Sequence, residues 1–171
     1  MSQLNVNTIG ARTGTTVSLA SGHTAVGFGG GKVLQVVGAT RATTQTTTST
    51  SLVDVTGMTV DITPAATSSK ILIKYSDNML TTRSSDVSTG ACFYSLLRDS
   101  TVLTENELTA YDNEGNRVRS LTVPVGLVFL DSPSTTSQVT YKIQMKAASS
   151  TTVHSQTYDD TASIVAMEIG A

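Results

Sequence analysis

Residues Leu121–Ala147, which read LTVPVGLVFLDSPSTTSQVTYKIQMKA, hold both the longest apolar run and the most regular alternation in the chain. In Val139–Lys146, apolar and polar side chains alternate with a period of two, which is typical of a β-strand with one face in water. Val123–Phe129 is apolar at almost every position, so we expect this strand to be covered on both faces, in the middle of a sheet. The polar segment between them contains Pro133 and predicts a turn, and hence an antiparallel hairpin.

The composition favours a single all-β domain. A chain of 171 residues is long enough to bury one hydrophobic core, and two full domains would be cramped. Only 14% of the residues are charged, and roughly three in ten are Ser or Thr. Thr is β-branched and suits a half-wet pleated surface, whereas the residues that favour long helices are scarce.

The charge balance and the terminal residues exclude several classes of function. The formal net charge is −2, and the basic residues are scattered, so we expect no binding to nucleic acid. Neither a basic segment leading into an apolar one nor an apolar run near 18 residues occurs, so we expect no secretion signal and no membrane insertion. Cys92 is the only cysteine and cannot form an internal disulfide, so we expect a buried, unreactive thiol.

Residues 1–31 differ from the rest and are interpreted as an N-terminal arm. Glycines accumulate at its end, in Gly27–Gly31, which suggests a flexible joint. The apolar residues are too few for a core but alternate as those of an added strand would, so we expect them to bind another polypeptide. The predicted attachment residues are Leu4, Val6, Ile9, Val17 and Leu19.

Residues 32–171 are predicted to form an antiparallel, jelly-roll-like β-sandwich. Short strand-like segments follow one another with turn residues such as Gly57, Pro64 and Gly115 between them, and no helical pattern intervenes. We interpret the tract 43–51 as an edge or wet-face segment. The expected strands are 33–39, 51–55, 58–62, 70–80, 91–98, 117–130, 138–146, 151–155 and 163–169.

Three long connections are the expected places for recognition, namely 77–90, 104–116 and 147–162. The second reads TENELTAYDNEGN and is the most acidic part of the chain, which would suit contact with a sugar or a basic surface. The candidate recognition residues are Glu105, Glu107, Tyr111, Asp112 and Tyr158. A solvated crossover would explain the same composition.

The sequence offers little for catalysis, and we expect no enzyme activity, no cofactor and no metal site. A serine nucleophile needs a base beside it, and only His23 and His154 could serve, without any G-x-S-x-G motif. The glycine-rich segment before Lys32 lacks the spacing of a phosphate-binding loop. His154 with the acidic pair 159–160 could hold a hard cation if that loop folded back. Paired carboxylates within 105–114 could cleave a glycan, although few aromatic residues are present to stack on a sugar.

Several phrases, taken together and in order, resemble small structural proteins of tailed bacteriophages, particularly those of cyanobacteria and other aquatic bacteria. They are LNVNTIGARTGTTVSLASGH, GFGGGKVLQVV, SSKILIKY, FLDSPSTTSQVTYK and SIVAMEIGA, and they cover most of the chain. The resemblance implies a virion-attaching N-terminal arm and a trimeric jelly-roll body of the receptor-binding or capsid-cementing type. It brings no catalytic residues. The short chain favours a capsid cement protein or a short head fibre over a tail fibre.

Three functions follow from this reading of the sequence. The first is a non-enzymatic homotrimer on the surface of the virion, bound to the capsid through its arm and reinforcing the shell. The second is a tail-fibre receptor-binding protein that uses the loops around Tyr111 and Tyr158 to recognise a glycan on the host surface. The third, from another class, is a glycan-cleaving enzyme that uses the carboxylates of the acidic connection.

Overall fold

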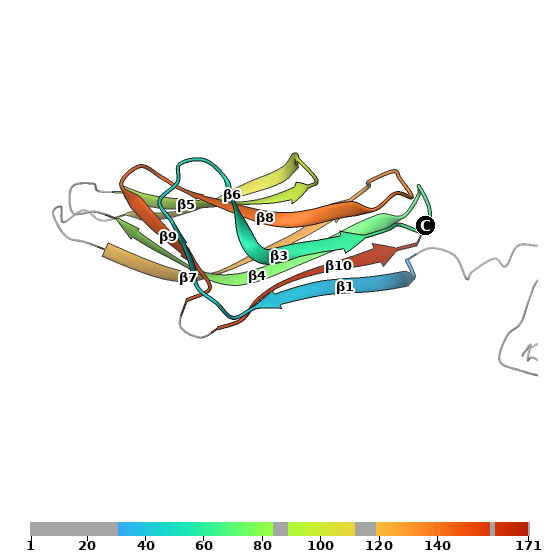
Figure 1. Cartoon of the computed structure of the whole chain (residues 1–171), viewed down its shortest axis with the longest axis horizontal. Coiled ribbons are helices and arrows are strands. Elements are labelled where there is room, and N and C mark those ends of the chain that lie inside the picture. The colour runs from blue at the N-terminus through green and yellow to red at the C-terminus, as the bar shows by residue number, and fades with distance from the viewer. Residues whose placement is uncertain (1–30, 84–88, 112–118, 158–159, 171) are drawn as a thin grey trace, which may run out of the picture.

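The computed structural model describes residues 31–83, 89–111, 119–157 and 160–170 (Figure 1). These residues form two antiparallel sheets packed into a sandwich, and no helix occurs among them. Sheet A contains β1 (Val33–Arg41), β10 (Ala162–Ile169), β4 (Lys70–Arg83) and β7 (Arg119–Asp131), together with the short strands β2 (Gln45–Thr47) and β9 (Thr151–Ser155). Sheet B contains β3 (Val53–Ile62), β8 (Val139–Ala147), β5 (Thr89–Arg98) and β6 (Thr101–Tyr111).

The strand pairing is that of a jelly roll. When β2 and β9 are set aside, the eight remaining strands pair from the outside of the chain inward, β1 with β10, β3 with β8, β4 with β7 and β5 with β6. A long hairpin rolled up in this way places alternate pairs in opposite sheets, which gives the orders β1-β10-β4-β7 and β3-β8-β5-β6. The predicted fold class, an antiparallel jelly-roll-like sandwich, is therefore confirmed.

The core lies between the sheets because each strand turns alternate apolar side chains inward. In β8, Tyr141, Ile143 and Met145 are fully buried, and they face the equally buried Ile71 and Ile73 of β4 in the same cluster. The strand predicted from the alternation in Val139–Lys146 is therefore confirmed. Within the described ranges, no helix has the length and hydropathy needed to span a bilayer.

The predicted hairpin across Pro133 is wrong. β7 pairs with β4 in sheet A, whereas β8 pairs with β3 and β5 in sheet B, so the segment 132–138 crosses from one sheet to the other. In this crossing Ser134 adopts a positive φ of 53°. Periodicity identifies a strand but carries no information about its partner, so two strands adjacent in sequence need not pair.

The expectation that Val123–Phe129 is covered on both faces is also wrong. β7 is an edge strand of sheet A, and the outward side of this apolar segment leaves Val128 66% exposed. Its inward side chains, Val125, Leu127 and Phe129, pack on the core. Strand β7 therefore carries apolar side chains on a face that nothing in the described chain covers.

Two further predictions need correction in detail. The expected strands 51–55 and 58–62 are replaced by the single strand β3, Val53–Ile62. In it Gly57 adopts a φ of 81°, and the register with β8 shifts between Asp54 and Thr59. Gly57 therefore marks an irregularity within one strand, since only glycine adopts this φ without steric cost. The connection 104–116, expected to be a loop, contributes most of β6. The tract 43–51 agrees with its interpretation as an edge segment, because part of it forms β2 at the end of its sheet.

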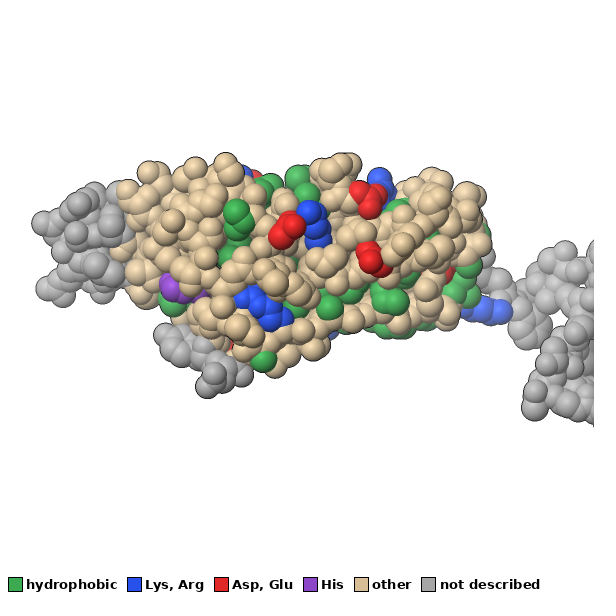
Figure 2. All heavy atoms as spheres, viewed as in Figure 1, with side chains coloured by type: hydrophobic (Ala, Val, Ile, Leu, Met, Phe, Trp, Pro, Cys, Tyr) green, Lys and Arg blue, Asp and Glu red, His purple; other side chains and the backbone are tan. Residues whose placement is uncertain are grey.

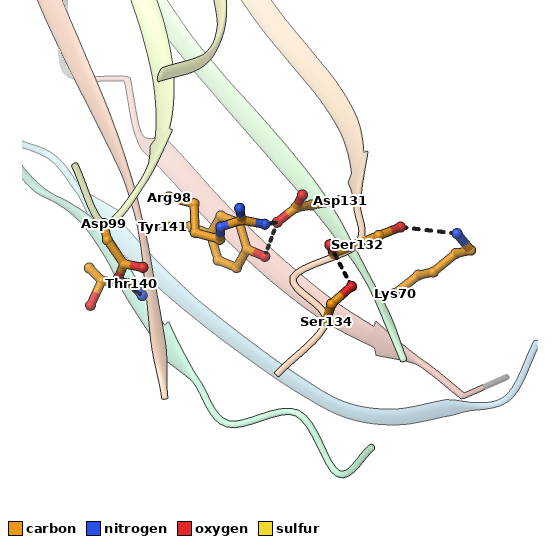
Figure 3. Close-up of polar contacts among 8 residues, drawn as sticks. All are labelled: Lys70, Arg98, Asp99, Asp131, Ser132, Ser134, Thr140 and Tyr141. Carbon is orange, nitrogen blue, oxygen red and sulfur yellow. Dashed lines mark hydrogen bonds and ion pairs between the residues drawn. The ribbon is translucent and has the colours of Figure 1, made fainter. Parts of the chain in front are cut away.

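An ion pair joins the two sheets at one end of the sandwich (Figure 3). The Asp131 carboxylate at the end of β7 accepts hydrogen bonds from Arg98 Nη1 at 2.7 Å and from Tyr141 Oη at 2.6 Å. Arg98 and Tyr141 belong to sheet B, so Asp131 fastens sheet A to it. Burial and the neighbouring carboxylate raise the pKa of Tyr141, which remains a neutral donor.

Candidate interaction face

Two rows of side chains cross the outer face of sheet A at the end where β1 begins. The register aligns Val36, Met167, Leu72 and Leu130 across β1, β10, β4 and β7. The next residues along these strands, Val37, Ala166, Ile73 and Phe129, form a parallel row that packs in the core. Since successive side chains point to opposite faces of a sheet, the first row faces outward.

The second outward row lies two residues further along and contains Gly38, Val165, Lys74 and Val128. We call these two rows together the apolar face. Three of its side chains are more than half exposed, Val36 (56%), Leu130 (54%) and Val128 (66%). Figure 2 shows part of the surface around it, where hydrophobic side chains gather over β1 and β10.

The apolar face carries one charge and no carboxylate. Six of its eight residues are Val, Leu or Met, and Lys74 is its only charged residue. Single exposed apolar residues are ordinary, but contiguous apolar rows on a sheet face mark contact with another macromolecule. The face therefore suits a partner that offers apolar side chains and that tolerates or neutralises one lysine.

The outer face of sheet B is built differently. Lys142 lies 2.9 Å from the carboxylate of Asp54, and Lys146 lies 3.0 Å from that of Glu105. Lys146 also stands over the ring of Phe93, 4.7 Å from its centroid. These pairs follow the alternating Lys residues of β8. Paired charges of this kind are satisfied in water, so the two outer faces of the sandwich differ in chemistry.

The apolar face lies on the sheet that β1, the first described strand, helps to form. Gly31 N donates to Gly170 O at 2.8 Å, and Gly170 N donates to Lys32 O at 2.8 Å. These bonds hold the start of β1 beside the end of β10. Val33 and Leu34, the first residues of β1, are themselves about half exposed, at 53% and 48%. Residues 1–30 therefore join the body at the margin of the apolar face.

The predicted attachment residues Leu4, Val6, Ile9, Val17 and Leu19 all lie outside the described residues, as do Asp112 and Tyr158. Their roles remain predictions. The division into an arm, 1–31, and a body, 32–171, likewise remains a prediction. All strands of the described chain lie between residues 33 and 169.

The acidic residues Glu105 and Glu107 lie on strand β6 and not in a loop as predicted. Glu105 accepts hydrogen bonds from Lys146 Nζ at 3.0 Å and from Ser95 Oγ at 3.1 Å, and the Lys146 contact is the main cause of its lowered pKa. Glu107 accepts a bond from Thr109 Oγ1. Tyr111 is the last residue of the same strand. The described part of the acidic segment is thus an edge strand, where acidic side chains oppose pairing with other chains.

The remaining candidates for chemistry are occupied or buried. His154 lies on β9, where its Nδ1 hydrogen-bonds Thr46 Oγ1 at 2.9 Å and burial lowers its pKa. Cys92 is buried, and burial raises its pKa to about 11. No group of three His, Cys, Asp or Glu side chains in the described ranges is placed to hold a metal ion. The cation site considered at His154 would need Asp159, which lies outside the described residues.

A hollow lies beside the connection between β1 and β2. Its lining consists of 40–45 together with Thr56 and Gly57. Arg41 is the only charged residue of this lining, and its guanidinium lies 3.5 Å from Ser155 Oγ. Burial lowers the pKa of Arg41. Gln45 is held by Thr56 N and by Asp54 O, so its amide is already bonded on both sides.

The chain matches no protein family, and no curated protein is similar to it in sequence. Among solved structures, it is similar to that of infectious bursal disease virus, Gx strain, with 12% identity and a TM-score of 0.35, covering 90% of this chain and 43% of that one. The VP2 subviral particle of the same virus gives 12% identity and a TM-score of 0.32, covering 79% and 39%. The chain therefore spans about two fifths of the length of these structures.

Sequence reasoning missed the apolar face. Its signal was present in Leu127–Leu130, where apolar side chains occupy both alternate sets of positions. A continuous apolar strand indicates either burial inside its own fold or a face for another molecule, and periodicity alone does not separate the two. The register with β4 and the edge position of β7 show that the described part of the chain leaves the outer side of this segment uncovered.

Proposed function

We propose that this protein is a non-enzymatic structural component of a bacteriophage virion, attached through residues 1–31, with its jelly-roll body at the particle surface. The observation that carries the proposal is the apolar face, which includes strand β1, the strand that follows residues 1–31 directly in the chain. A body with one polar, ion-paired face and one apolar face suits a subunit that exposes one side to water and buries the other against protein.

The resemblance to small phage structural proteins supports the same function and adds the finer features. We propose a homotrimer that acts as a capsid cement or decoration protein, or as a short head fibre. An assembled particle must survive without a disulfide from this chain, whose single cysteine is buried. Large apolar contacts between subunits can supply that stability instead.

The arm is tested on particles that lack the protein. Full-length protein and a Leu4→Glu/Ile9→Glu variant are added to such particles, which are then pelleted and analysed. We expect the full-length protein to be recovered with the particles and the variant to stay in the supernatant, because a carboxylate placed in an apolar contact is costly to desolvate. A Gln3→Glu/Thr8→Glu variant has the same charge on polar positions and serves as the control. Equal recovery of all three proteins would refute the proposed attachment through the arm.

The number of copies per particle separates the two structural roles. Hundreds of copies would establish a cement protein, and a few dozen or fewer would establish a fibre. Quantitative mass spectrometry of purified particles against an isotopically labelled standard measures this number. Absence of the protein from purified particles would refute the proposed function itself.

A receptor-binding fibre that recognises host glycan is the alternative. The hollow beside Arg41 favours it, because threonine hydroxyls and one guanidinium are groups that bind sugars carrying an acidic substituent. Titration of the full-length protein with host surface polysaccharide would test it. Binding by the wild type that is lost in an Arg41→Gln variant would support this function.

A further inference from the structure

The apolar face ends at a strand edge that has no partner among the described residues. There β7 pairs only with β4, so its other edge presents unpaired backbone groups. Pro124 has no N–H to donate, which leaves Val125–Leu130 as the part of this edge that a further strand could extend. Val128 and Leu130, the outward side chains of this part, are both more than half exposed. An added strand would cover them.

Two apolar faces do not suit each other as direct partners. Lys74 lies within the second row, between Val165 and Val128, and neither row contains a carboxylate. Packing the face on its own copy about a twofold axis would bring two lysines into an apolar contact with no compensating charge, which is costly. The expected partner is therefore a neutral segment with alternating apolar side chains.

The N-terminal arm contains such a segment. Residues 15–20 read TTVSLA, and residues 1–30 include no Asp or Glu and one Arg. Val17 and Leu19 are two residues apart, as are Val128 and Leu130, so both pairs can lie side by side on the same face of two adjoining strands. The hydroxyls of the intervening threonine and serine residues suit the wet surroundings of the sheet edge.

We propose that residues 15–20 of one copy add a strand to the free edge of β7 of a second copy, with Val17 and Leu19 packed against Val128 and Leu130. This inference rests on the proposed function for the role of the arm.

The arm joins the body at β1, while the acceptor edge β7 lies at the opposite side of the sheet, about three strand spacings or 14 Å away. Donor and acceptor on opposite edges make a head-to-tail contact, which forms a ring such as a trimer when the rotation between copies closes and an open filament when it does not. The dozen or so residues between Leu19 and Lys32 can span up to about 40 Å.

The contact is tested first by the mass of the full-length protein in solution. We expect the wild type to sediment as a multiple of its 17.8 kDa chain and a Val128→Glu/Leu130→Glu variant to associate at least tenfold more weakly. Val102→Glu is the matched control, because Val102 is 46% exposed on the other sheet. A wild type that stays monomeric, or a face variant with unchanged mass and unchanged circular dichroism, would overturn the proposal.

A disulfide cross-link then identifies the segment that pairs with the free edge of β7. One full-length chain carries Val17→Cys and a second, tagged chain carries Val128→Cys, and the two are expressed together and oxidised. We expect a linked pair of chains, and none when Val102→Cys replaces Val128→Cys. The native Cys92 is buried with a raised pKa, so it does not compete. If a doubly substituted chain links only within itself, the arm folds onto its own body and the proposal fails.

Failure of this contact can be distinguished from failure of the proposed function. The Leu4→Glu/Ile9→Glu variant leaves residues 15–20 intact, so it should lose particle binding and keep the mass of the wild type. The Val17→Glu/Leu19→Glu variant should no longer form the oligomer and should have the mass of a single chain. If the protein is found in particles but Val17→Glu/Leu19→Glu leaves the mass of the protein in solution unchanged, the virion function stands and the strand exchange is refuted.

Discussion

A buried cluster around Asp77 holds two strands of the sandwich together. Asp77 accepts hydrogen bonds from Tyr75 Oη at 2.7 Å, Ser155 Oγ at 2.6 Å and Gln156 N at 2.9 Å, which ties β4 to the end of β9. These groups are buried, and each donor has its acceptor within the cluster. A buried polar network of this kind is structural when its hydrogen bonds are satisfied.

The Asp131 cluster should make a measurable contribution to stability. Replacing Asp131 with Asn removes the charge that accepts from both Arg98 and Tyr141, and we expect the free energy of unfolding to fall by about 2 kcal/mol. Urea denaturation measures the change. Asp54→Asn is the control, because that carboxylate is largely exposed and its pair with Lys142 contributes about 1 kcal/mol or less. Equal losses in both variants would mean that Asp131 has no special role.

Glu168 should make the protein sensitive to acid. The side chain is buried, which by itself raises its pKa. Hydrogen bonding from Ser69, from Gln35 Nε2 at 2.6 Å and from Ala65 N at 2.7 Å together outweighs burial, so its pKa lies below the usual 4.5. A lowered pKa in the folded state stabilises the protein above pH 4.5, and this stabilisation is lost as the pH falls through the folded-state value. A Glu168→Gln variant should therefore unfold with a smaller pH dependence between pH 5 and 3 than the wild type.

The control for this prediction is Glu105→Gln. The pKa of Glu105 is also lowered, chiefly by the hydrogen bond from Lys146, but this pair is exposed and screened by solvent. The change in pH dependence should be smaller than that of Glu168→Gln. Urea denaturation at several pH values gives both slopes, and identical slopes for wild type and Glu168→Gln would contradict the assignment.

At the scale of the elements, β3 shows that pairing with a neighbouring strand decides whether a strand continues through a glycine. Gly57 lies where sequence reasoning places a turn between two strands, and the structure continues through it as one irregular strand. A glycine before a hydrophobic alternation is compatible with both outcomes. Pairing of both halves with β8 keeps the strand in one sheet, and such pairing is not visible in local sequence.

Replacing Gly57 with Ala should destabilise the protein by about 1–2 kcal/mol, because an L-residue at a φ of 81° is strained. The added methyl would lie 3.7 Å from the nearest atom of Arg41, so crowding contributes little. Gly126→Ala in β7 is the matched control: its Cβ would lie 3.6 Å from Tyr75 O, in ordinary contact, and its φ is not positive. Thermal unfolding should give a lower melting temperature for Gly57→Ala than for Gly126→Ala. Equal stability of the two variants would contradict backbone strain at position 57.

At the scale of the whole molecule, the body should fold without its arm. The buried apolar cluster lies entirely between Val55 and Ala166, so deleting residues 1–31 removes none of it. We expect the shortened protein to have the circular dichroism spectrum of the wild type. Its melting temperature should lie within a few degrees of that of the monomeric wild-type chain. Deleting residues 1–41 also removes β1, which exposes the edge of β10, and should prevent stable folding. Loss of folding in the first deletion would mean that the arm belongs to the core.

The sequence by itself determined the all-β class and the positions of most strands, because alternation with a period of two and the Ser and Thr content are local properties of the chain. Only the tertiary structure decided that β7 pairs with β4 and not with β8, that the acidic segment around Glu105 is a strand, and that the apolar run Leu127–Leu130 lies at an outer edge. These are questions of which strand lies beside which. Pairing depends on contacts between residues far apart in the chain, and an apolar side chain reads the same in the sequence whether its own fold or another molecule covers it.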